Sequence, residues 1–276
     1  MQTLIKEVTM FTQHFGLKFN PFTKEISTND LFQSKDTKEL ESRFKYIKTS
    51  RGIFLLTAEA GTGKTTALRK FVDGLNPGLY RPCYYALSTV TVMDFYRGLI
   101  MKMGETPVYK KINMFEQLQR LIYQSYHDQR ITPVIIIDEA QSLSNNVLDD
   151  LRILFNFKMD SENPYILILS GQSPLRNRLQ LGINQPLKQR INVKYHMQGL
   201  CRDEINDYFE SRLKMAGAAE TRIFTDGALD SVFTITKGMP RIINKLATSC
   251  LMCACANKTD TIDDEIVYQA HQDIEI

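Results

Sequence analysis

One stretch of the sequence combines residue types that are suited to binding phosphate groups. The segment LLTAEAGTGKTT leads from a short apolar run directly into a helix-forming sequence. Its residues Gly63, Lys64 and Thr65 match the end of the pattern G-x-x-x-x-G-K-[ST], in which backbone N–H groups, a lysine and a hydroxyl bind phosphates and Mg²⁺. Ala58 replaces the first glycine of that pattern, while Gly61 keeps the loop flexible.

This loop is expected to hold ATP together with Mg²⁺. Lys64 would reach the β- and γ-phosphates, Thr65 would ligate Mg²⁺, and Thr66 would lie near the α-phosphate. The N-terminus of the following helix adds a partial positive charge. The predicted ATP contacts are Ala58, Glu59, Ala60, Gly61, Thr62, Gly63, Lys64, Thr65 and Thr66. The alternative is a glycine-rich turn that binds nothing, which the flanking strand and helix disfavour.

Two adjacent carboxylates follow a second apolar run, in the sequence VIIIDEAQSL. Asp138 and Glu139 end this run, where ligands bind in an open parallel sheet. Asp138 is expected to bind Mg²⁺ directly or through water, and Glu139 to act as general base on the attacking water. A strand followed by an acidic helix cap is the alternative. The phosphate loop upstream disfavours this alternative. The adjacent Asp138 and Glu139 favour an ATP hydrolase, because many nucleotide kinases use such a loop without this glutamate.

The elements that position these motifs are expected to alternate between buried strands and amphipathic helices. The predicted strands are 52–58, 83–88, 134–138 and 165–171. The predicted helices between and before them are 35–49, 64–74, 91–104, 115–129 and 145–157. Strands that are apolar throughout and alternate with helices indicate a parallel sheet that is covered on both faces.

Beyond about residue 199 the sequence predicts only helices. Their expected ranges are 202–216, 225–235, 240–256 and 262–272. We therefore divide the chain into an N-terminal segment (1–34), an α/β domain (35–199) and a small helical domain (200–276).

The overall composition is ordinary for a globular protein. Of 276 residues, 43% are hydrophobic and 24% are charged. No apolar run approaches the roughly 18 residues of a membrane span, and the N-terminus lacks the apolar core of a signal peptide. We expect a cytoplasmic protein with no membrane partner. The net charge of +3 permits nucleic-acid binding through a local patch only.

The five cysteines are expected to be reduced thiols, because their number is odd and no signal peptide precedes them. The segment CLMCACA at 250–256 is interpreted as an apolar helix with buried cysteines rather than as a metal site.

The order of these motifs resembles that of the AAA+ ATPases, and more closely that of the ExeA-like group. This group includes secretion ATPases and transposition ATPases of the TnsC/TniB type. The resemblance covers nearly the whole chain and rests on HFGLKFNPF, LLTAEAGTGKTT, DEAQSL, LDDLRILFNF, LSGQSPL, LKQRI and KGMPRIINKL. It implies a P-loop AAA+ fold of class α/β, with a parallel sheet flanked by helices and a small C-terminal all-helical lid domain.

The resemblance also implies roles around the nucleotide. Asn20, Pro21 and Phe22 in the N-terminal segment would form the wall of the adenine pocket, with a plain turn as the alternative. Gln172, after the fourth expected strand, would be the sensor-one residue that responds to the nucleotide, and Ser170 is the second candidate.

Two arginines resemble further catalytic groups of this family. Arg190 in LKQRI resembles the arginine finger, which neutralises charge on the γ-phosphate bound by a neighbouring subunit. Arg178 competes for this role, and a surface arginine is the alternative. Arg241 in GMPRIIN resembles sensor two and follows Pro240, which suits a first helical turn. A shared site would make hydrolysis depend on a homo-oligomer, either a ring or a helical filament.

The function favoured by the resemblance is regulation of transposition. The protein would assemble on double-stranded DNA in an ATP-dependent manner and recruit or activate a transposase, possibly with a target-selection protein. The expected DNA contacts, which would meet phosphates without reading sequence, are Ser88, Thr89, Arg97, Lys102, Lys110 and Lys111. A solvated helix and loop is the equally weighted alternative for this segment.

Three other functions remain open. They are a secretion or cell-envelope ATPase, another DNA-linked AAA+ loader, and a non-catalytic nucleotide switch. Secretion ATPases of this group usually add a membrane span and a periplasmic part, and the sequence contains neither, so we expect transposition first. Glu139 argues that the site can turn over ATP rather than act only as a switch.

Overall fold

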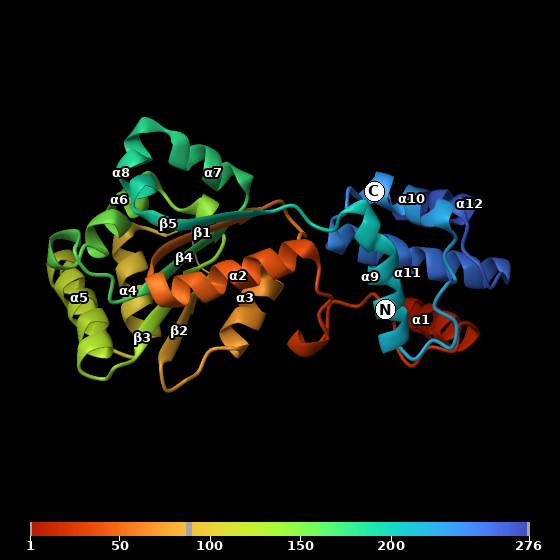
Figure 1. Ribbon diagram of the computed structural model, residues 1–276, viewed down its shortest axis with the longest axis horizontal. Helices are drawn as coiled ribbons and strands as arrows, with labels where there is room; N and C mark the ends of the chain where they lie inside the picture. Colours follow the sequence, from red (N-terminus) through yellow and green to blue (C-terminus); the bar gives the residue numbers. More distant parts are fainter. Residues whose placement is uncertain (1, 87–89, 275–276) are drawn as a thin grey trace. The chain divides into compact units, whose positions relative to one another are not determined.

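Across the residues that the computed structural model describes, 2–86 and 90–274, five strands form a parallel sheet in the order β2-β3-β4-β1-β5 (Figure 1). The strands are β1 (Gly52–Ala58), β2 (Tyr80–Tyr85), β3 (Thr132–Ile137), β4 (Ile166–Gly171) and β5 (Ile191–Met197). The three central strands β1, β3 and β4 are buried along their whole length. The expected α/β fold with a parallel sheet flanked by helices is therefore confirmed.

Alternate residues of each strand enter cores on opposite faces of the sheet, as the pleat of a strand requires. Ile53 and Leu55 face one core, and Phe54 and Leu56 face the other. The first core is covered by α4 (Val92–Lys102), α5 (Lys111–His127), α6 (Asn145–Leu154), α7 (Ser173–Gln180) and α8 (Gln185–Gln189). The second is covered by α2 (Lys35–Ser50) and α3 (Lys64–Asp73).

The strand β5 was not among the four strands expected from the sequence, so that expectation was wrong. β5 pairs with β1 and lies at the edge of the sheet. Only Val193 and Met197 of its seven residues are buried, because an edge strand needs little apolar surface. The other edge strand, β2, begins at Tyr80 rather than at residue 83 and exposes Arg81 and Pro82.

Chain contacts divide the protein into two units. A sheet unit comprises Glu39–Ala60 and Lys64–Met197, and a helical unit comprises Met1–Lys38, Gly61–Gly63 and Gln198–Ile276. The helices of the second unit are α1 (Gln2–His14), α9 (Arg202–Met215), α10 (Asp226–Thr236), α11 (Pro240–Asn257) and α12 (Asp264–Ile274). The N-terminal segment thus shares one core with the C-terminal helices.

The cysteines of α11 are part of that core. Cys250 and Cys253 are buried, and burial raises the pKa of both thiols. Within the part of the chain that is described, no cluster of three or more histidine, cysteine or carboxylate side chains is arranged to hold a metal ion. None of the helices in that part is long and apolar enough to cross a membrane.

Candidate nucleotide-binding and hydrolysis site

The candidate phosphate-binding loop joins the buried strand β1 to the N-terminus of α3. β1 ends at Ala58 and α3 begins at Lys64. Between them, Gly61 and Gly63 have φ angles of 89° and 102°, in a region that residues with a Cβ rarely adopt. The glycines of the motif are therefore required by the backbone of the loop.

The side chain of Lys64 folds back over the loop. It is only 6% exposed, and its Nζ donates hydrogen bonds to the carbonyl oxygens of Ala58 at 3.0 Å and Glu59 at 3.2 Å. A buried ammonium group is stable only with compensating partners, and a phosphate is a stronger partner than a carbonyl. Lys64 is thus suited to hold the phosphates of ATP at this loop.

We expect Lys64→Ala to weaken ATP binding by about 30-fold or more, because removing one partner of a buried charge pair costs about 2–5 kcal/mol. Titration with a fluorescent ATP analogue measures this change. Lys45→Ala is the matched control, since Lys45 is exposed on α2. Wild-type affinity in Lys64→Ala would exclude the assigned role.

Asp138 is surrounded by hydroxyl donors from three other elements. It is 2% exposed and accepts hydrogen bonds from Thr65 Oγ1 at 3.3 Å, Tyr84 OH at 2.8 Å and Ser170 Oγ at 2.8 Å. The carboxyl ends of β2, β3 and β4 and the start of α3 meet at this point. Mg²⁺ prefers carboxylate and hydroxyl oxygens, so Asp138 and Thr65 form a suitable donor set for it.

Tyr84 is a site residue that the sequence did not reveal. Burial, together with its hydrogen bond to Asp138, raises the pKa of Tyr84, so its hydroxyl stays a neutral donor. The expected boundaries of β2 hid this residue, because they placed the end of the strand near residue 88 rather than at Tyr85. The available signal was a polar side chain near the carboxyl end of a strand.

The carboxylate of Glu139 is bound by two amides. Glu139 has a left-handed backbone, with φ of 53°, and its side chain is exposed. Its Oε2 accepts hydrogen bonds from Gln141 Nε2 at 2.6 Å and from Gln172 Nε2 at 3.3 Å. Of the two sensor-one candidates, Gln172 therefore contacts Glu139, whereas Ser170 contacts Asp138.

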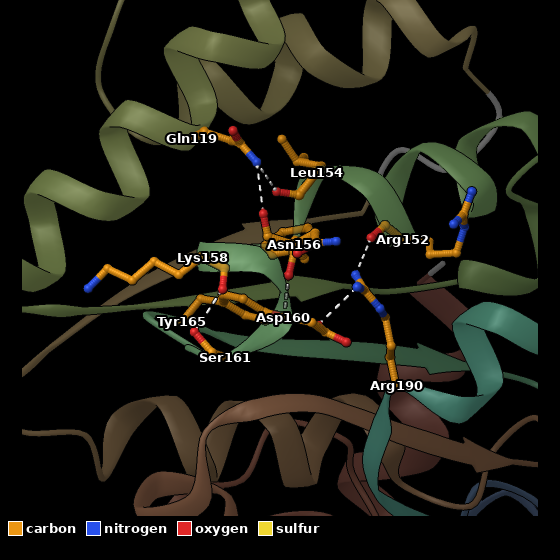
Figure 2. Close-up of polar contacts among 10 residues, drawn as sticks. Gln119, Arg152, Leu154, Asn156, Lys158, Asp160, Ser161, Tyr165 and Arg190 are labelled. Atoms are coloured by element: carbon orange, nitrogen blue, oxygen red, sulfur yellow. Dashed lines mark hydrogen bonds and ion pairs between the residues drawn. The ribbon is translucent and has the colours of Figure 1, made fainter.

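Arg190 is held by its own chain in this structure. Its Nη2 lies 2.9 Å from Asp160 Oδ1, and its Nη1 donates to the carbonyl oxygen of Arg152 (Figure 2). The side chain is 19% exposed, at the junction between α8 and β5. Arg190 therefore contacts residues of its own sheet unit in this structure.

The competing candidate, Arg178, binds the loop that follows Glu139. Its guanidinium donates to the carbonyl oxygens of Gln141 at 2.8 Å and Leu143 at 2.6 Å, and to Asn145 Oδ1 at 2.7 Å. These contacts fix the backbone of the loop. Arg178 is therefore engaged in positioning the loop.

The remaining nucleotide-site candidates belong to the helical unit. Phe22 is 3% exposed and packs against Phe209, with ring centroids 5.0 Å apart. Asn20 binds the backbone N–H of Phe22 and the side chain of Thr248, and Pro21 is also buried. Arg241 is exposed as the second residue of α11. Their roles toward the nucleotide stay predictions.

The predicted DNA contacts differ in their surroundings. Ser88 and Thr89 lie outside the described residues. Arg97 pairs with Asp94 at 3.2 Å. Lys111 pairs with Asp150 at 2.7 Å.

The other two lysines of this set, Lys102 and Lys110, lie on either side of the connection from α4 to α5. Both side chains are exposed to solvent.

Comparison with known proteins matches part of the chain to a family. Residues 47–179 match the family described as AAA domain. General secretion pathway protein A from Aeromonas hydrophila is 30% identical over 261 residues, which cover 92% of this chain and 46% of that protein. The chain thus spans about half the length of this curated relative.

Solved structures share the fold at low sequence identity. The ORC2 protein of Aeropyrum pernix, in ADPNP–ADP complexes, matches with a TM-score of 0.64 and 16% identity, covering 92% of this chain and 71% of that one. The Aeropyrum pernix ORC1 protein in complex with DNA matches with a TM-score of 0.61 and 15% identity, covering 92% and 69%. The family match thus covers an AAA domain at residues 47–179, the 30% identity is a likeness to a secretion-pathway protein of the ExeA-like group, and the solved structures share the fold.

Proposed function

We propose that this protein is an ATP-dependent DNA-binding ATPase that assembles on double-stranded DNA and recruits or activates a transposase. The observation that carries the proposal is the exposed pair Lys102 and Lys110 beside the connection between α4 and α5, in the same unit as Lys64, Asp138 and Glu139. Exposed lysines suit the phosphate backbone, which binds without regard to sequence. The resemblance to transposition ATPases supplies the transposase as partner.

Hydrolysis at this site would use groups that the sheet edge brings together. Lys64 would hold the β- and γ-phosphates, and Thr65 and Asp138 would hold Mg²⁺. When bound, Mg²⁺ neutralises charge on the phosphates. Glu139 would accept a proton from the attacking water, and Gln172 would link that carboxylate to the nucleotide-sensing end of β4.

The site would be completed by a second copy of the chain. Arg190 from the neighbouring subunit would neutralise the charge that develops as the γ-phosphate leaves. Arg241 would sense the γ-phosphate, and Asn20, Pro21 and Phe22 would line the adenine. The ATP-bound form would bind DNA cooperatively as a ring or helical filament, and hydrolysis would release it.

A second candidate is an ATPase of a secretion or cell-envelope system. The 30% identity to general secretion pathway protein A favours it. That relative is about twice as long as this chain, and the match covers 46% of it. In this candidate the assembled form would not need DNA.

Electron microscopy with double-stranded DNA tests the two candidates. We expect rings or filaments on DNA with a slowly hydrolysed ATP analogue and free protein with ADP. Assemblies that form equally well without DNA would contradict the first candidate and favour the second.

Binding measured against salt concentration tests the proposed contacts. Replacing Lys102 or Lys110 by alanine should lower the slope of log affinity against log salt by about 1 each, because each lysine that contacts a phosphate releases about one counterion. Lys45→Ala on α2 is the control and should leave the slope unchanged. Equal slopes for all three variants would exclude this surface as the DNA contact.

A further inference from the structure

Gln141 is held in one orientation by its surroundings. It lies in the short 3₁₀ turn Ala140–Ser142 that follows Glu139. Its Oε1 accepts a hydrogen bond from the backbone N–H of Gln172 at 3.0 Å, and its Nε2 donates to Glu139 Oε2 at 2.6 Å. The reverse amide orientation would oppose donor to donor and acceptor to acceptor, so these partners fix which atom is which.

The end of β4 leaves room for this side chain. A Cβ on Gly171 would lie 2.8 Å from Gln141 Oε1, 2.9 Å from Leu175 Cδ2 and 3.2 Å from the backbone nitrogen of Gln141. Gly171 does not have a positive φ angle, so the backbone conformation does not require glycine here. The close approach of Gln141 is a reason for glycine at this position.

The backbone of Gln141 is fixed independently from α7. Arg178 donates to its carbonyl oxygen at 2.8 Å and to that of Leu143 at 2.6 Å. The turn is thus tied through the Gln141 side chain to Gln172, where β4 passes into α7, and through Arg178 to the body of α7. An amide that is fixed in this way can hold a carboxylate in place, and a hydrogen bond to a charged acceptor is stronger than a neutral one.

We propose that Gln141 is a positioning residue for ATP hydrolysis, which orients the Glu139 carboxylate and couples it to the end of β4. The inference rests on the proposed role of Glu139 as the general base. A displacement of Gln172 would be transmitted to Glu139 along two routes, through the Gln172 side chain and through the Gln141 amide. The β4 end, where nucleotide state is expected to be sensed, would thereby set the position of the base.

Steady-state hydrolysis by the full chain, with ATP, Mg²⁺ and double-stranded DNA, tests this role. Gln141→Ala should lower kcat by about 10- to 100-fold, the range expected when a catalytic group is misplaced by about 1 Å. KM and the affinity for a fluorescent ATP analogue should stay within about twofold, because Gln141 is not proposed to touch ATP.

Gln141→Glu separates orientation from packing. Glutamate has the same shape and retains an oxygen that accepts from the Gln172 N–H, but it turns a negative oxygen toward Glu139. We expect a loss of kcat at least as large as in Gln141→Ala. A wild-type kcat in either variant would overturn the proposal. Glutamate keeps the shape of glutamine, so Gln141→Glu would keep a wild-type kcat if Gln141 served packing alone.

Gly171→Ala tests whether the Gln141 side chain needs the space that glycine leaves at position 171. It should lower kcat, because its Cβ would meet Gln141 Oε1 as well as Leu175 Cδ2. When Gln141 is already truncated to alanine, the same change should lower kcat by a smaller factor than it does in the wild-type chain. Losses that multiply in the double variant would overturn the coupling between the two residues.

Gln119→Ala is the matched control. Gln119 also joins two backbone segments through its amide, donating to the carbonyl oxygens of Leu154 and Asn156 at 3.2 Å each (Figure 2). The kcat of Gln119→Ala should stay within about twofold of wild type if the loss of kcat in Gln141→Ala depends on contact with Glu139.

Glu139→Gln separates failure of the proposed base from failure of the proposed positioning role. An active Glu139→Gln would overturn the assigned base, whereas an inactive Glu139→Gln beside an active Gln141→Ala would overturn the positioning role alone.

Discussion

Glu139→Gln is expected to bind ATP with wild-type affinity and to hydrolyse it about 100- to 10,000-fold more slowly, the range for loss of a general base. The amide has the shape of the carboxylate but cannot accept the proton of the attacking water. ATP would then persist in the site, and assemblies on DNA would be long-lived. Single-turnover hydrolysis and the lifetime of the DNA complex measure the two effects.

The control for this prediction is Glu116→Gln, which removes a carboxylate from an exposed position on α5. Its turnover should match that of the wild-type protein. If Glu139→Gln turned over at the wild-type rate, another group would have to be the base. If Glu139→Gln failed to bind ATP, its defect would lie in the binding site and not in the chemistry.

Arg190→Ala should lower kcat by about 1,000- to 100,000-fold if Arg190 supplies an arginine finger in trans. The loss should be reversed in part by mixing the variant with Glu139→Gln. At a mixed interface the first protein supplies Glu139 and the second supplies Arg190, so some sites are complete. Hydrolysis measured across mixing ratios, at a constant total concentration, reports this complementation.

Absence of activity in every mixture would show that Arg190 and Glu139 must come from the same chain, or that Arg190 serves only its ion pair with Asp160. Arg152→Ala is the matched control. The Arg152 side chain makes an exposed ion pair with Asp149, which contributes at most about 1 kcal/mol. Its carbonyl, the partner of Arg190, is retained in the variant.

The parts of the site that are built from residues adjacent in the chain could be predicted from the local sequence. The loop before Lys64 needs glycine at positive φ, and the motif displays this requirement directly. Asp138 and Glu139 follow an apolar run long enough to be a buried strand, which puts both at the sheet edge. The parallel α/β fold followed from the same apolar runs.

Tertiary structure alone decided what surrounds these groups. Tyr84 and Ser170 meet Asp138 because β2 and β4 flank β3 in the sheet, a register that no local pattern encodes. Gln141 reaches Glu139 and β4 through a turn that Arg178 fixes from a separate helix.

The strand β5 escaped prediction for a related reason. Its edge position demands few apolar residues, so its sequence carries little signal. The phosphate loop and the acid pair could be predicted from residues adjacent in the chain, and the α/β class from the alternation of apolar strands with helices. Strand order and side-chain partners depend on contacts between distant segments, and only the folded chain decided them.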